Sequence, residues 1–418
     1  MNKDALQRLR ADRIDWRYKG FPPADGVTPA TVAAHGWNLL DGHLFLPALV
    51  LRESALAHNL ELMSRWCDSH GVSLAPHGKT TMSPELFARQ LHAGAWAMTA
   101  ATPSQVRVYR AFGIERILLA NELVEPVSLR WVADELAADL SFEFLCIADS
   151  LGAVEAMDGA LHEVNVPRRL LVLGQLGLAG GRTAARTVDD ALAVAGAIGR
   201  SPVLELAGIE GYEGIVHDDT RVDAFLGELQ RLLDRLVDAG AFDRLEEIVV
   251  TAGGSVYFDR VAEVLASADP RVRIVVRSGC YLTHDDGLYD EHSPLGSRAP
   301  GRERLRPALE AWGAVLSRPE PELALVGMGK RDVPYDAGLP VPLKSRGRDG
   351  LRNVRGAMDV VDLNDQHAYV RLHAADPLAV GDLIGCGISH PCTAFDKWRL
   401  IPVVDDGYRV IDAVHTFF

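Results

Sequence analysis

EEIVVTAGGS (246–255) and RIVVRSGCY (273–281) each run from an uninterrupted apolar stretch straight into a turn of small residues. Runs this short and this uniformly apolar are typical of parallel strands that are covered on both faces. The segment RVDAFLGELQRLLDRLVDAG (221–240) precedes them, and its apolar residues recur at helical spacing. The sequence therefore predicts strands and helices in alternation, which is the pattern of an α/β fold.

The same alternation extends from about Leu46 to about Tyr281. TVDDALAVAGAIGRS (187–201) is expected to be another helix. We expect five further parallel strands: PALVLRES (47–54), RILLANE (116–122), SFEFLCIA (141–148), RLLVLGQL (169–176) and ELAGIEGYEG (205–214). An eightfold barrel needs this alternation, but an open doubly wound sheet gives the same local pattern. The strand count alone does not decide between them.

The texture of the sequence changes after about Arg298. Short β-rich runs separated by Pro, Gly and Asp predict a small antiparallel β domain: AVLSRP (314–319), ELALVGMG (322–329), AYVRLHA (368–374), GDLIGCGI (381–388) and RLIPVV (399–404). LPVPLKSRGRDGLRN (339–353) is expected to be a loop. The boundary is expected within DEHSPLGSRAPGRER (290–304). We therefore expect a segment 1–45 that packs partly on the β domain, a barrel over 46–298 and a β domain over 299–418.

Composition and charge exclude several classes of protein. The 418 residues are 48% hydrophobic and 24% charged, as in ordinary globular proteins. A net charge of −14 argues against nucleic acid or an anionic membrane as partner. The first 20 residues lack the apolar core of a secretory signal, and no run approaches the length that spans a bilayer. Five scattered cysteines fit reduced thiols, so we expect a cytoplasmic protein.

LAPHGKTTMSPELFARQL (74–91) contains the first candidate for chemistry. A strand-like approach ends at Pro76, Lys79 follows in a turn, and Ser83 and Pro84 then have the positions of an N-cap and a first helical residue. This places Lys79 at the carboxyl end of a strand, where barrel enzymes assemble their sites. A partly desolvated lysine there could form an imine with a carbonyl cofactor. The alternative is an ordinary solvated lysine.

The two glycine turns are candidates for binding a phosphate. Late strands of such barrels commonly end in loops whose backbone N–H groups hold this group. The candidates are Gly253, Gly254, Ser255, Gly279 and Cys280. Taken singly, either turn is explained equally well as a tight connection between a strand and a helix. Together with Lys79, they outline a site with an imine at one end and a phosphate at the other.

His390 and Cys392 form a second candidate site. In an extended segment, side chains two residues apart project on the same side, so an imidazole and a thiolate could converge on one cation. A single H-x-C pair is a weak signal, because structural zinc normally needs four such ligands. A half-buried cysteine beside an ordinary histidine is the competing explanation.

Several of these motifs occur together in one known group of enzymes. PALVLRESALAHNL (47–60), PHGKTT (76–81), GGRT (180–183), EGYEG (210–214), RSGCY (277–281) and SHPCTAFDKW (389–398) together resemble the D-serine dehydratase and D-threonine aldolase group. That group belongs to the fold-type III pyridoxal phosphate enzymes. The resemblance implies an alanine-racemase-like (β/α)8 TIM barrel followed by a C-terminal antiparallel β domain.

The resemblance also implies roles for individual residues. Lys79 matches the lysine that carries pyridoxal phosphate as a Schiff base, and His77 matches a histidine packed near the cofactor. Tyr212 is expected at a strand end facing the site. Arg182 matches less well, because GQLGLAGGRT (174–183) is richer in glycine than the racemase turn whose arginine meets the pyridine nitrogen. The phosphate-side and ring-side turns correspond to Ser255, Gly279, Cys280 and Tyr281.

For the second site, the resemblance implies Zn2+ on His390 and Cys392, with coordination positions left open. It predicts a D-serine dehydratase that eliminates water from a D-β-hydroxy amino acid to give a 2-keto acid and ammonia. The alternatives are a D-3-hydroxyaspartate dehydratase and a D-threonine aldolase, which would use Mn2+ or Mg2+. Aldolase-type relatives typically have aspartate where this chain has Cys392. A homodimer with its site at the subunit interface is expected.

A non-catalytic pyridoxal phosphate binding protein is the alternative from another class. Such proteins share the barrel but lack the appended β domain. The residues after Arg298, and the pair His390 and Cys392 in particular, count against it.

Overall fold

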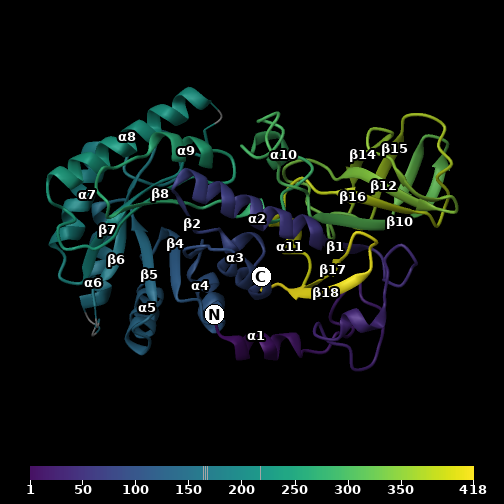
Figure 1. Ribbon diagram of the computed structural model, residues 1–418, viewed down its shortest axis with the longest axis horizontal. Coiled ribbons are helices and arrows are strands. Elements are labelled where there is room, and N and C mark those ends of the chain that lie inside the picture. Colours follow the sequence, from purple (N-terminus) through teal and green to yellow (C-terminus); the bar gives the residue numbers. More distant parts are fainter. Residues whose placement is uncertain (163, 165, 167, 217) are drawn as a thin grey trace. The chain divides into compact units, whose positions relative to one another are not determined.

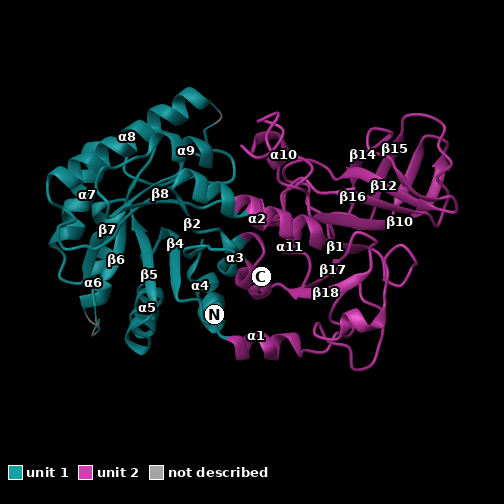
Figure 2. Ribbon diagram, in the orientation of Figure 1, with its two compact units in different colours: residues 1–2, 64–79, 90–279 teal, residues 3–63, 80–89, 280–418 magenta. Residues whose placement is uncertain are grey.

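The computed structural model describes residues 1–418 apart from residues 163, 165, 167 and 217. Its chain divides into two compact units, which Figure 2 shows in separate colours. Unit 1 comprises residues 1–2, 64–79 and 90–279, and unit 2 comprises residues 3–63, 80–89 and 280–418. Both units are built from pieces that alternate along the chain, whereas the sequence suggested continuous segments.

Unit 1 contains eight parallel strands in the order β2-β9-β8-β7-β6-β5-β4-β3. Their bounds are β2 (Ser73–Leu74), β3 (Met98–Ala100), β4 (Arg116–Glu122), β5 (Glu143–Ala148), β6 (Leu170–Leu176), β7 (Leu204–Gly211), β8 (Ile248–Ala252) and β9 (Val272–Val276). Backbone hydrogen bonds from Trp96 N to Leu74 O (2.8 Å) and from Thr99 N to Pro76 O (2.9 Å) join the first strand segment to the last. The sheet therefore closes on itself, which confirms the predicted barrel.

Helices follow the strands and lie outside the sheet (Figure 1). They are α4 (Pro103–Ala111), α5 (Pro126–Ala138), α6 (Leu151–His162), α7 (Val188–Arg200), α8 (Asp219–Asp238) and α9 (Phe258–Val264). Three of them begin at side-chain caps, because Thr102, Thr187 and Asp218 each accept a hydrogen bond from a backbone N–H three residues later. Two more helices, α2 (Glu53–His70) and α3 (Pro84–His92), begin in unit 2 and end in unit 1.

Side chains fill the interior of the barrel. A single cluster takes one buried residue from, or directly beside, each strand: Ala75, Ala97, Leu118, Leu145, Leu173, Ala207, Val249 and Val275. Three of the eight are alanines, so small and large side chains together fill a narrow cross-section. The centre of the barrel is thus a packed core, and polar chemistry is left to its ends.

Unit 2 is organised around a ten-stranded, mostly antiparallel sheet. Its strands are β1 (Ala48–Arg52), β10 (Leu309–Glu320), β11 (Leu323–Val326), β12 (Val341–Gly347), β13 (Gly350–Asn353), β14 (Met358–Leu363), β15 (Ala368–Leu372), β16 (Leu383–Gly387), β17 (Leu400–Val404) and β18 (Val410–His415). The short helices are α1 (Lys3–Arg10), η1 (Val32–His35), η3 (Cys280–Leu282), α10 (Leu288–His292) and α11 (Cys392–Phe395), while η2 (Gly78–Thr80) crosses from unit 1. The predicted antiparallel β domain is confirmed.

Two local predictions are wrong. PALVLRES (47–54) was expected in the barrel, but β1 pairs antiparallel with β10 and parallel with β17. Its four leading residues are fully buried, so composition alone could not distinguish this sheet from a barrel strand. LPVPLKSRGRDGLRN (339–353) was expected to be a loop, but β12 and β13 form a hairpin in which Gly347 pairs with Gly350. Prolines and charged residues conceal the alternation there.

Residues near the amino terminus contribute to the core of unit 2. Ile14, Phe21, Val27, Val32, Leu39 and Leu44 are buried in one cluster with Val50, Trp312, Tyr408 and other β-sheet residues. Arg10 adds a bidentate ion pair to Asp412 on β18, with N···O distances of 2.9 and 3.1 Å. Among the described residues, no helix is long and apolar enough to cross a membrane.

Gly208 provides a test of the barrel geometry. It has φ +148° and lies where β7 shifts register against β6, and a Cβ there would be 1.8 Å from the carbonyl oxygen of Val249 on β8. Gly208→Ala should therefore lower the free energy of unfolding by about 3 kcal/mol, measured from urea midpoints. Gly227→Ala, at an open position inside α8, is the control and should raise it by about 0.5–1 kcal/mol. Equal midpoints for the two variants would contradict this geometry.

Candidate active site

Lys79 follows the shortest barrel strand. The segment before it is held to β3, because the Thr99 hydroxyl donates to the carbonyl of Ala75 (2.6 Å) and His77 bridges Thr99 in parallel. The chain then turns into η2, which carries Lys79 with its side chain exposed. The ammonium group therefore lies at the carboxyl end of β2, as predicted, and is open to a carbonyl ligand.

A buried ion pair lies at the same ends of neighbouring strands. The Arg277 guanidinium, directly after β9, donates to Glu210 Oε1 on β7 (2.6 Å) and to Thr251 Oγ1 on β8 (2.8 Å). Both charged side chains are 2% exposed. Burial raises the pKa of Glu210, and the charge of Arg277 opposes that shift. The sequence analysis missed both residues, although Arg277 opens the RSGCY motif.

His77 is the predicted cofactor neighbour, and its electrostatics fit that role. Burial lowers its pKa well below the usual value, and the charges of Lys79, Arg277 and Arg182 lower it further. The imidazole is therefore neutral at pH 7. Its Nδ1 is buried with no hydrogen-bond partner, as are Glu210 Oε2 and Arg277 Nε. These three unpartnered atoms indicate that a polar ligand or water belongs beside them.

The first glycine turn already holds an anionic group. Gly253, with φ +80°, and Gly254 donate their backbone N–H groups to the two carboxylate oxygens of Glu213, at 3.0 and 3.2 Å. The turn thus has the donor geometry expected for an anion. Because Glu213 takes these two donors, a phosphate must use the neighbouring N–H groups or displace the carboxylate. Ser255 lies beyond them and accepts from the Ser278 hydroxyl (3.2 Å).

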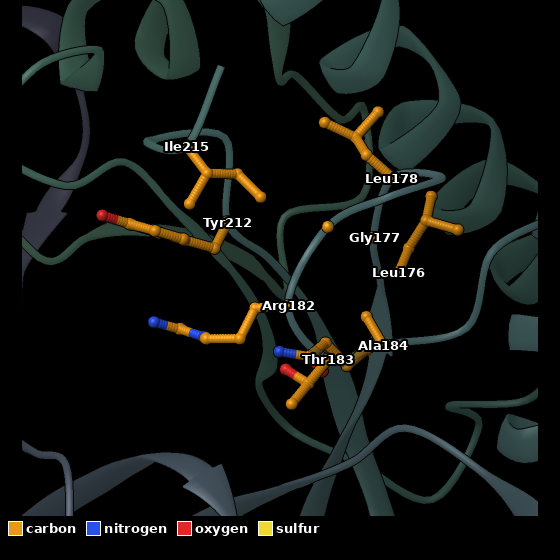
Figure 3. A pocket seen from close by; sticks show the side chains of 10 residues that line it. Leu176, Gly177, Leu178, Arg182, Thr183, Ala184, Tyr212 and Ile215 are labelled. Carbon is orange, nitrogen blue, oxygen red and sulfur yellow. The ribbon is translucent and has the colours of Figure 1, made fainter.

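Arg182 and Tyr212 lie together beside a small cavity. Figure 3 shows both side chains extending in the same direction, with the guanidinium carbon 5.3 Å from the centre of the Tyr212 ring. The cavity has a volume of about 20 Å³, room for a water molecule. Arg186, which the sequence analysis missed, ties the turn together by donating to the carbonyls of Leu178 (2.7 Å) and Thr183 (2.8 Å).

In unit 2, the side chains of His390 and Cys392 lie close together, as expected. The backbone between them, however, is not the extended segment that the sequence suggested. The segment between them is helical, since Pro391 has φ −60° and ψ −39° and Cys392 begins α11. The two side chains lie close enough to shift each other's pKa. His390 Nδ1 also contacts the carboxylate of Asp336 at 2.6 Å, and the Thr393 hydroxyl donates to the same carboxylate at 2.6 Å. Asp336 was missed, because 54 residues separate it from His390.

These contacts shift the pKa values of His390 and Cys392 in opposite directions. Burial opposes a charge on His390, but Cys392 and Asp336 outweigh burial and raise its pKa to about 9. The pKa of Cys392 is lowered well below its usual value by hydrogen bonds from Cys280 and His390, against burial. Zinc would have to displace the proton of His390 to bind it, and an imidazole backed by a carboxylate and a neighbouring thiolate are ligands that zinc prefers. Among the described residues, however, no three His, Cys, Asp or Glu side chains form a group that could hold an ion.

The second turn leads into a buried polar segment in unit 2. Cys280 and Tyr281 are 3% and 2% exposed. Further along, His284 has φ +46° and both ring nitrogens buried without a hydrogen-bond partner. Asp285 Oδ1 accepts from the backbone N–H groups of Gly287 (3.0 Å) and Tyr289 (2.9 Å), and burial raises the pKa of this carboxyl to about 6. The sequence analysis did not single out this segment.

Comparison with known proteins agrees with the motifs. A family described as "Putative serine dehydratase domain" matches residues 308–404. A D-threonine aldolase from Arthrobacter sp is 26% identical over 369 residues, covering 86% of this chain and 89% of the aldolase. The resemblance inferred from PHGKTT and SHPC is therefore confirmed.

Solved structures agree on the fold. A D-threonine aldolase from Filomicrobium marinum has a TM-score of 0.75 at 24% identity, covering 91% of this chain and 97% of its own. D-threo-3-hydroxyaspartate dehydratase from Delftia sp. HT23 has a TM-score of 0.71 at 20% identity, covering 91% and 99%. An alanine racemase from Clostridium difficile 630 has a TM-score of 0.60 at 13% identity, covering 89% and 98%. The fold is therefore alanine-racemase-like, as predicted.

Proposed function

We propose that this chain is a pyridoxal phosphate dependent lyase that acts on D-β-hydroxy amino acids, with Lys79 as the cofactor-bearing residue. The observation that carries the proposal is the exposed Lys79 at the end of a barrel strand, with the unpartnered buried atoms of His77, Glu210 and Arg277 in the same unit. The D-amino acid relatives with the same fold support it.

The residues of unit 1 fit the proposed cofactor. Pyridoxal phosphate supplies a conjugated ring that accepts the electron pair released at the α-carbon of a substrate. Neutral His77 and Tyr212 are proposed to contact this ring, and Arg182 is proposed to bind one of its polar atoms. The phosphate is proposed to lie against the two glycine turns, whose candidate residues are Gly253, Gly254, Ser255, Gly279, Cys280 and Tyr281. Lys79, once released by the substrate amine, is proposed to take the α-proton.

His390 and Cys392 are proposed to hold Zn2+. The imidazole and thiolate suit zinc, and Asp336 fixes His390 by the hydrogen bond to Nδ1. With only two protein ligands, the ion would keep positions for water or substrate. Zinc would supply a Lewis acid for the β-hydroxyl, which is otherwise a poor leaving group. A homodimer remains part of the proposal from the resemblance.

The choice of substrate follows from the relatives and from Cys392. The family that matches residues 308–404 is described only as a putative serine dehydratase domain. The similar proteins that span most of the chain include D-threonine aldolases and a D-threo-3-hydroxyaspartate dehydratase, which favours our two alternatives over D-serine dehydratase. A thiolate ligand favours zinc and dehydration, whereas an oxygen ligand would suit Mn2+ or Mg2+. We therefore propose dehydration of a 3-hydroxyaspartate-like substrate first, and retro-aldol cleavage second because of the 26% identical aldolase. D-serine ranks third.

Lys79 can be tested without turnover. Borohydride reduction of the purified protein with pyridoxal phosphate should attach the cofactor covalently to Lys79, because reduction converts an imine into a stable secondary amine. Peptide mapping by mass spectrometry locates the adduct. Lys3→Ala, which removes an exposed lysine of α1, is the control and should be labelled like the wild type. A Lys79→Ala variant that still traps one cofactor per chain would contradict the assignment.

If His390 and Cys392 hold the metal, removing or exchanging the metal should change which bond of the substrate breaks. Chelation should suppress keto-acid formation while the cofactor absorbance still responds to substrate, since imine exchange needs only Lys79. Cys392→Asp should bind zinc less well and manganese relatively better, and should lose dehydration. If retro-aldol cleavage depends on this ligand, the variant should also release glycine from D-threonine. The measurements are metal content, keto acid and glycine.

Two results would overturn the assignment of this pair. One is unchanged keto-acid production by a verified metal-free wild type, which would make the pair structural. The other is a Cys392→Asp variant with wild-type zinc content and dehydration. Cys386→Ala, at a buried cysteine on β16, is the control and should keep the wild-type metal content.

A further inference from the structure

Two cysteines of unit 2 lie in direct contact. Cys280 Sγ, in η3, is 3.5 Å from Cys392 Sγ, at the start of α11, although 112 residues separate them in sequence. This distance leaves no room for another atom between the sulfurs. The other three cysteines, Cys67, Cys146 and Cys386, are all buried.

Polar groups surround the two sulfurs. The Thr80 hydroxyl is 3.4 Å from Cys392 Sγ and 3.9 Å from Cys280 Sγ. Tyr289 lies beside Cys280, and His390 lies beside Cys392. The pair is therefore not simply packed among apolar side chains, as a structural cysteine normally is. Hydroxyl and imidazole groups beside the sulfurs can exchange the protons that thiol chemistry releases.

We propose that Cys280 and Cys392 form an oxidisable dithiol that a peroxide converts to a disulfide. Cys392 is partly exposed whereas Cys280 is 3% exposed, so hydrogen peroxide reaches Cys392 first. Its sulfur attacks the peroxide, the O–O bond breaks, and a sulfenic acid and one water form. The sulfur of Cys280 then attacks this sulfenic sulfur, the S–O bond breaks, and the disulfide and a second water form.

The step balances in atoms and electrons. Two thiols and one hydrogen peroxide give one disulfide and two waters, and the two electrons lost by the sulfurs reduce the peroxide. The sulfurs must approach from 3.5 Å to about 2.05 Å, a movement of about 1.5 Å. Both cysteines lie in short helical turns at the ends of connecting segments, and neither is inside a strand of the sheet.

The cross-link has a consequence for the metal site. A sulfur in a disulfide is no longer a thiolate ligand, so the disulfide and zinc exclude each other at Cys392. Only this exclusion of zinc rests on the proposed function. Formation of the disulfide itself depends only on the two thiols and the oxidant. An experiment can therefore contradict the disulfide without contradicting the zinc site, and the reverse.

The test uses the full chain, reduced and freed of metal. Hydrogen peroxide should lower the number of thiols titrated after unfolding by two from the five in the sequence, and peptide mapping should find Cys280 linked to Cys392. Dithiothreitol should restore both thiols. Cys280→Ser should give oxidised Cys392 without a cross-link. Cys386→Ala, which leaves the pair intact, should form the same cross-link as the wild type.

Three outcomes would overturn the proposal. They are retention of all five thiols, over-oxidation of Cys392 while Cys280 stays a thiol, and a cross-link that involves another cysteine. A parallel reaction with zinc-loaded protein measures whether bound zinc changes the rate of cross-linking. Slower cross-linking would support the exclusion of zinc by the disulfide. An unchanged rate of cross-linking in protein with verified bound zinc would show that Cys392 is not a zinc ligand. It would not contradict the dithiol proposal.

Discussion

The closure of the barrel at its shortest strand is the constraint on which the candidate active site depends. The strand β2 has only two residues, yet Ser73 and Leu74 pair with Val275 and Val276 of β9. On its other side, the same segment is held by the hydrogen bonds from Trp96 and Thr99. A chain held on both sides has little freedom in direction, so the turn that follows carries Lys79 to a defined position at the barrel end.

The constraint also explains why polar residues gather at one end of unit 1. The barrel interior is filled by one apolar side chain per strand, so charged groups fit only beyond that layer. Glu210 and Arg277 lie there with Thr251 between them, and each retains a polar atom that no protein group satisfies. Burying such atoms lowers stability unless a ligand or water completes their hydrogen bonds, which suits a site prepared to receive one.

The sequence predicted those features that depend on local pattern. Uniform apolar runs indicated six of the barrel strands, and PHGKT indicated Lys79 because a strand, a turn and a helix start follow each other directly. It failed for β1, whose composition equals that of a barrel strand, and for β3, which has only three residues. Glu213 and Asp336 were missed because their roles come from tertiary contacts. No spacing rule shows that a carboxylate 54 residues away holds His390.

We propose that this chain breaks a bond at the β-carbon of a D-amino acid. The most direct measurement is incubation of the cofactor- and zinc-loaded protein with D-threo-3-hydroxyaspartate, D-threonine and D-serine and their L-enantiomers, scoring keto acid, ammonia and glycine. With Lys79 proposed as the base on one face of the bound substrate, the account predicts products from the D-series alone, with keto acid and ammonia exceeding glycine. Equal rates with the L-series, or no product from any of the six compounds, would contradict it.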